Sequence, residues 1–137
     1  MTRILLAAIM MITAGVQVVA QNNVKFIPEQ VVQGRNTTIV YDNRKSPLSE
    51  SENTKGVIYF WENYQWRADD LMLTKKDSVW VAEYTIPESA ALVLVVYTSG
   101  NKIDKGGKFP YCQFVIDESG KAAPSAYIGW GLLRNMK

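Results

Sequence analysis

The sequence predicts an all-β protein, an antiparallel β-sandwich of about seven strands that ends in a short C-terminal helix. Three observations predict this fold. Short segments rich in β-branched and aromatic residues either alternate in polarity or are continuously apolar, as strands do. Turn-forming residues separate these segments at short spacing, and no helical periodicity occurs among them. The predicted strands span residues 24–28, 36–41, 56–61, 71–73, 79–86, 92–97 and 111–116.

The first twenty residues predict a cleaved signal peptide. Arg3 precedes an uncharged run over residues 4–16, and Val18 and Ala20 occupy the small-residue positions that a signal peptidase reads. The apolar run is shorter than the roughly 20 residues that span a bilayer, which disfavours the alternative of a retained membrane helix. We therefore expect cleavage after Ala20, export to the periplasm or the extracellular space, and no membrane attachment afterwards.

Composition limits the remaining chain to a few classes of protein. Residues 21–137 are enough for about one domain, which we divide into a sandwich over 21–120 and a linker with a helix over 121–137. The whole chain has 15 Lys and Arg residues against 13 Asp and Glu residues, a formal net charge of +2. Such a balance gives no reason to expect nucleic acid or an anionic membrane as a partner.

Two residue types that carry much of enzyme chemistry are scarce. The chain contains no histidine, which excludes Ser-His-Asp and Cys-His mechanisms and imidazole zinc sites. Cys112 is the only cysteine, so an internal disulfide is excluded too. No Gly-x-Ser-x-Gly motif occurs. We expect a protein that is not an enzyme and that uses no cofactor and no metal.

The individual segments predict where the core lies. In the strand over 79–86, Trp80 shares one face with Ala82 and Tyr84 and is interpreted as a core residue. The strand over 92–97 is continuously apolar, which favours a central strand covered on both faces. Residues 42–55 are polar and without period, and we expect a long surface loop there.

The C-terminal segment predicts a short helix. Ser125 can cap a helix that carries Tyr127, Trp130 and Leu133, after a linker-like segment at 122–124. A helix of about a dozen residues is marginal alone. We expect it to dock on the sandwich or to lead into a further domain, with the chain a fragment of a longer protein.

An aromatic stretch over residues 56–66 is the main candidate for a binding site. Trp61, Tyr64 and Trp66 cluster at the end of one predicted strand and in the loop that leaves it, beside Asn63. Sugar rings stack their C–H faces on aromatic planes while their hydroxyls need polar partners. The alternatives are that Trp66 covers the end of the core and that Trp61 faces the core from its strand.

The order of features resembles the starch-binding carbohydrate-binding modules, which have an immunoglobulin-like sandwich. The segments are GRNTTIVY, GVIYFWENYQW, LMLTKKDSVWVAEYTIP and LVLVVYTSGNKIDKGG, and the match covers roughly residues 34–113. The sugar-contacting loop of that family reads tryptophan-aspartate-asparagine-asparagine. Asp104 matches it, whereas Ile103 replaces the tryptophan and both asparagines are absent. The resemblance implies an immunoglobulin-like fold and a glycan ligand held by Trp61, Asn63, Tyr64, Trp66 and Asp104.

A second resemblance covers the whole chain after the predicted cleavage point. The chain is similar to the N-terminal domain of exported proteins of Gram-negative gut bacteria, in which helical repeats and a thioredoxin-like domain follow. The segment DESGKAAPSAY and the helix after it resemble the junction in those proteins. This resemblance implies the alternative function, a structural or interaction domain whose helix contacts another protein domain through Tyr127, Trp130 and Leu133.

Overall fold

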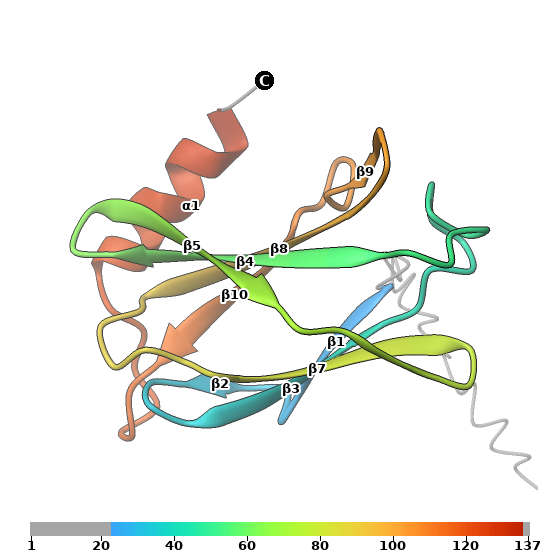
Figure 1. The fold of residues 1–137 in the computed structure, drawn as a ribbon. Coiled ribbons are helices and arrows are strands. Elements are labelled where there is room, and N and C mark those ends of the chain that lie inside the picture. The colour runs from blue at the N-terminus through green and yellow to red at the C-terminus, as the bar shows by residue number, and fades with distance from the viewer. Residues whose placement is uncertain (1–22, 136–137) are drawn as a thin grey trace, which may run out of the picture.

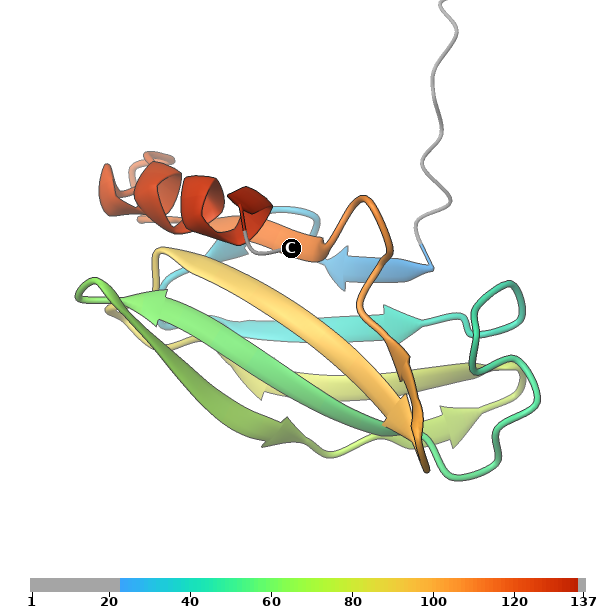
Figure 2. The same ribbon diagram turned by 90° about the horizontal axis from the view of Figure 1, so that it is seen from above.

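Two β-sheets face each other in the computed structural model, which describes residues 23–135, and one helix lies on the outer side of the second sheet (Figures 1 and 2). The first sheet has the order β1 (Val24–Ile27), β3 (Asn36–Tyr41), β7 (Val79–Thr85), β6 (Thr74–Lys76). The second has the order β2 (Val31–Val32), β10 (Tyr111–Ile116), β8 (Leu92–Ser99), β4 (Lys55–Glu62), β5 (Gln65–Leu71), with β9 (Lys102–Asp104) paired to β8. The all-β prediction is confirmed.

Strand β5 lies where the sequence predicted a loop, so the prediction of a strand over 71–73 is wrong. Asn63 and Tyr64 have φ angles of 48° and 61°. Positive φ at both central residues is typical of a two-residue hairpin turn, so the chain reverses at once after β4. Strand β5 then pairs with β4 from Glu62↔Gln65 to Gly56↔Leu71. Its period is hard to recognise because an edge strand carries mostly exposed, charged residues.

The strand count and the strand directions also differ from the prediction. Between residues 23 and 135 there are ten strands instead of about seven, because β2, β6 and β9 add short pieces of two or three residues. Strand β2 pairs with β10 in parallel, whereas all the other ladders are antiparallel. Pieces of this length have too few residues to show a period.

The main core lies between the two sheets. Strand β8 is central, as expected, and directs Val93, Val95 and Tyr97 into this core. Trp80 of β7 is buried there as well, which confirms its interpretation as a core residue. The opposite face of β8 points away from the sandwich and toward the helix.

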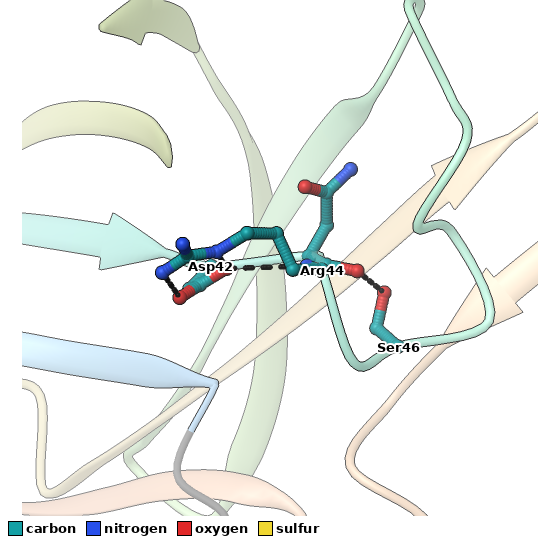
Figure 3. Close-up of polar contacts among 4 residues, drawn as sticks. Asp42, Arg44 and Ser46 are labelled. Carbon is teal, nitrogen blue, oxygen red and sulfur yellow. Dashed lines mark hydrogen bonds and ion pairs between the residues drawn. The ribbon is translucent and has the colours of Figure 1, made fainter. Parts of the chain in front are cut away.

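The predicted surface loop joins β3 to β4, and short-range bonds hold its first turn. The Arg44 guanidinium donates to both carboxylate oxygens of Asp42, at 2.9 and 2.7 Å, and lowers the pKa of that carboxyl (Figure 3). Ser46 Oγ donates to the Asn43 carbonyl at 2.9 Å (Figure 3). Because the Asp42–Arg44 pair is solvent-exposed, it contributes little to stability.

The expected signal peptide, residues 1–20, lies outside the described residues. Between residues 23 and 135, no helix has both the length and the apolarity needed to cross a membrane.

Candidate functional site

The helix α1 (Ser125–Asn135) docks on the outer face of the second sheet and forms a second hydrophobic cluster. Trp61 lies at its centre, and Leu92 and Ala126 are buried beside it. The indole Nε1 of Trp61 donates a hydrogen bond to the Ser125 carbonyl at 2.8 Å. Gly129 lies directly on the same indole, since a Cβ at this glycine would be 2.7 Å from its Cγ. The helix therefore docks, which was one of its two expected roles.

Trp61 is buried by this helix, which corrects its expected role as a stacking residue. Its exposed fraction is 4%, and its indole N–H is already bonded within the protein. Alternation along β4 puts Trp61 on the outer face of the sheet, opposite Phe60 in the main core. Trp61 thus faces a core, but this core lies between sheet and helix.

Three of the expected ligand residues remain near the surface around the β4–β5 turn. Trp66 lies opposite Trp61 in the ladder, with ring centroids 5.2 Å apart, and is half-buried. Tyr64 is 65% exposed and meets Trp61 edge-on. Asn63 is exposed in the same turn. The structure therefore brings Asn63, Tyr64 and Trp66 together.

Asp104 lies apart from these residues and is buried, which corrects its expected role as a hydrogen-bond partner for a sugar. Its exposed fraction is 5%, and its Oδ2 accepts hydrogen bonds from the hydroxyls of Tyr41 and Tyr111 at 2.6 and 2.9 Å. Asp104 pairs with Tyr97 and Trp61 pairs with Leu92, so five residues of β8, about 16 Å, separate them. Asp104 therefore anchors β9 to the core.

A groove of about 500 Å³ lies beyond the end of α1, on the same face of the sheet. Its floor is formed by outward side chains of β4 and β8, namely Tyr59, Leu94 and Val96. Trp66 and Leu133 line one part of it, and Ile103, Lys105 and Pro110 from the β9 region line another. Figure 1 shows α1 and β9 rising from the same side of this sheet, and Figure 2 shows them toward its opposite ends.

The groove is lined mostly by apolar side chains, and the outer face of β8 explains why. The apolar run of this strand predicted cover on both faces, and Leu92 is covered by α1. Leu94 and Val96 lie further along the same face and are only half-buried, because α1 does not extend over them. The sheet face is thus covered at one end and open at the other.

The residues expected to contact another protein domain lie in different environments. Trp130 packs into the second hydrophobic cluster, where it meets Phe114 edge-on at 6.4 Å. Tyr127 is exposed, although its ring also contacts Phe114. Leu133 lines the groove. Two further apolar residues of α1, Ile128 and Leu132, are exposed and do not line the groove.

Sequence reasoning missed most of the groove. In the family resemblance Ile103 only replaces a tryptophan, yet it is 57% exposed in the groove wall. Tyr59 lies in the strand predicted over residues 56–61 but is not among the expected ligand residues. Two features of the sequence could have revealed the groove. Alternate residues of the apolar run in β8 face outward, and the alternation along β4 puts Tyr59 on the same face as Trp61.

Positive charge borders the groove. Within the described part of the chain, Lys105 is the only charged residue that lines the groove, and Lys102 and Lys108 are exposed in the same segment. Arg134 is exposed beside Leu133 at the end of α1. None of these four takes part in an ion pair within residues 23–135.

A smaller cleft of about 350 Å³ lies between β5 and β7, and its polar groups already bond to each other. The buried Glu62 carboxylate accepts from Arg67 at 3.0 Å and from the Ser89 hydroxyl. Asp69 accepts from the Tyr84 hydroxyl at 2.6 Å and from the backbone N–H of Asp70 at 2.8 Å. Every carboxylate oxygen thus has a partner, and the cluster links the two sheets at their open edge.

A depression of about 710 Å³ is lined by residues of β2, β3 and the segment 116–120, and by none of the expected ligand residues. The exposed Arg35–Glu118 ion pair lies there.

Cys112 belongs to the second hydrophobic cluster, and burial raises the pKa of its thiol to about 12. Its thiol is therefore protonated at neutral pH and is a poor nucleophile.

Comparison with known proteins gives no match for this chain, either among protein-family models or among curated proteins.

Proposed function

We propose that this chain is a non-catalytic interaction module of immunoglobulin-like type, which binds an apolar surface of a partner protein in the groove between α1 and β9. The observation that carries the proposal is the half-covered outer face of β8. Leu94 and Val96 continue the apolar face that α1 covers over Leu92, and they form the floor of an open groove. Burial of apolar surface is the main favourable contribution to protein association.

The shape and extent of the apolar surface support a protein partner. The groove is within the range of about 300–1,000 Å³ that small-molecule sites occupy. Apolar side chains are also exposed outside it, however, with Ile128 and Leu132 on α1 and Phe109 next to Pro110. Large exposed apolar side chains on neighbouring elements favour a site for protein–protein contact. The resemblance to N-terminal domains of multidomain exported proteins agrees with this function and with the expected export.

The apolar character of the groove can be tested with the neutral dye Nile red, whose fluorescence increases in apolar surroundings. We expect saturable binding to the folded protein and its loss in Ile103→Asp, which places a charge on the groove wall. Ile103 is 57% exposed, so the substitution should leave the fold intact. Met72→Asp is the matched control, because Met72 is 83% exposed and does not line the groove.

The result that contradicts the proposal is equally specific. If Nile red does not bind, or if Ile103→Asp and Met72→Asp reduce its binding equally, the groove is not an apolar binding surface. Circular dichroism of each variant shows whether the fold is retained.

Glycan binding is the second candidate function, favoured by one observation. Tyr64 is exposed next to Trp66 and Asn63, so an aromatic surface and an amide lie together at the β4–β5 turn. A titration of tryptophan fluorescence with maltoheptaose tests it. A saturable shift that disappears in Trp66→Ala supports a sugar site at the turn. No shift at millimolar glycan excludes starch-like ligands there.

A further inference from the structure

We propose that the segment which fills the groove is an amphipathic α-helix of the partner, with acidic side chains along the borders of its apolar face. This inference rests on the proposed function and specifies the chemistry of the partner. Two features of the groove carry it. One is the strand pairing of the backbone under the groove floor, and the other is the positive charge around the groove.

The backbone of Tyr59 and Leu94, under the floor of the groove, is already paired on both sides within the sheet. Tyr59 pairs with Leu94 on one side and Ala68 on the other, and Leu94 also pairs with Cys112. An extended segment on this floor would place its own N–H and C=O groups against apolar side chains without partners, which is unfavourable. A helix satisfies its backbone internally and presents side chains only.

The same sheet face already packs against a helix. The docked α1 buries Ala126 and Gly129 against Trp61 at one end of the face, and the groove continues that face beyond Leu133. Helices commonly pack on the apolar face of a sheet, because each element buries one apolar side against the other. A partner helix would continue the layer that α1 begins.

The charge around the groove determines the expected charge of the helix. Lys105 lines the groove, Lys108 is exposed in the same segment, and Arg134 is exposed at the end of α1. Among residues 23–135, no acidic side chain lines the groove, and Asp104 of β9 is directed into the core. Unpaired cations around an apolar groove favour a partner with carboxylates at the edges of its apolar stripe.

The experiment compares designed peptides that differ in one property at a time. Two helical peptides of about 18 residues carry the same leucine stripe, with Glu borders in one and Lys borders in the other. A third has the Glu composition with central prolines that prevent a helix. Fluorescence anisotropy of labelled peptide measures binding. We expect the Glu helix to bind at least about tenfold more tightly than the other two, and less tightly as salt is raised.

Charge reversal identifies the residues responsible. Lys105→Glu should weaken binding of the Glu helix about tenfold and improve binding of the Lys helix. Lys25→Glu is the matched control, because Lys25 is exposed on β1 in the other sheet and should change neither affinity. Both substitutions are at exposed positions, and circular dichroism confirms that the fold is retained.

The possible outcomes separate this inference from the proposed function. Equal binding of the Glu and Lys helices, reduced in both by Ile103→Asp, overturns the inference about charge and leaves the interaction module in place. Strong binding of the proline peptide overturns the inference about a helix. If no peptide binds, or if Ile103→Asp has no effect on binding, both proposals are overturned.

Discussion

Gly129 of α1 and the indole of Trp61 are in direct contact, and this contact sets how closely the helix approaches the sheet. A Cβ built on Gly129 would lie 2.7 Å from Cγ and 2.8 Å from Cδ1 of Trp61. These distances are shorter than any normal contact between carbon atoms. The glycine therefore permits a docking distance that no residue with a side chain would allow, and the docked helix leaves the groove beyond it.

We predict that Gly129→Ala destabilises the protein by about 1–3 kcal/mol, because the added methyl group overpacks a rigid ring. Gly131→Ala is the matched control. A Cβ at Gly131 meets nothing within 4 Å, so this substitution should stabilise α1 by about 0.5–1 kcal/mol through helix propensity alone. Urea unfolding followed by tryptophan fluorescence measures both. Equal effects of the two substitutions would contradict the Trp61 contact.

Asp104 joins β9 to the core, and its removal should be costly. Asp104→Ala removes the acceptor for the hydroxyls of Tyr41 and Tyr111, and leaving buried donors unpaired costs about 1–3 kcal/mol each. We expect a loss of about 3 kcal/mol in the free energy of unfolding. Lys105→Ala, at an exposed neighbouring position, should change stability by less than about 0.5 kcal/mol. Similar losses in both variants would show that Asp104 has no special role.

Tyr97 differs from Tyr41 and Tyr111, whose hydroxyls donate hydrogen bonds to Asp104. Its hydroxyl is buried and has no hydrogen-bond partner within residues 23–135, while its ring stacks on Tyr41 with centroids 3.7 Å apart. We predict that Tyr97→Phe keeps the stack and stabilises the protein by about 1 kcal/mol, because it removes an unpaired polar group. Tyr111→Phe should instead destabilise it by a similar amount, about 1 kcal/mol. Thermal unfolding distinguishes the signs, and destabilisation by Tyr97→Phe refutes the assignment.

Stability should decrease at high pH through Tyr84. Burial, with a contribution from the hydrogen bond to Asp69, raises the pKa of Tyr84 to about 12 from its ordinary value of about 10. The folded state thus favours the neutral phenol. Its contribution to stability is complete below pH 10 and is lost as the pH rises toward 12.

The variant Tyr84→Phe isolates this effect. Wild type should lose more stability than the variant between pH 9.5 and pH 12 (roughly the interval over which Tyr84 ionises in the folded and unfolded chain). Urea unfolding at both pH values measures the difference. Tyr127→Phe, at an exposed tyrosine, is the control. An identical pH dependence in wild type and Tyr84→Phe would exclude the contribution of Tyr84.

Much of the fold was predictable because strand periodicity is local. The strands at 36–41 and 111–116 agree with β3 and β10 residue for residue, and the central position of β8 followed from its apolar run. Strand β5 was missed because it is an edge strand of exposed residues after a two-residue turn. A period of two is visible only where one face of a strand is buried.

The site was less predictable, because it depends on which faces meet. The sequence alone determined that Trp61, Tyr64 and Trp66 are near each other, since all three lie within six consecutive residues. Only the tertiary structure decided that α1 covers Trp61, that Asp104 faces the core, and that Leu94 and Val96 remain at the surface. Local spacing fixes neighbours along a strand, whereas the side on which a distant helix packs depends on contacts far apart in the chain, such as Gly129 on Trp61.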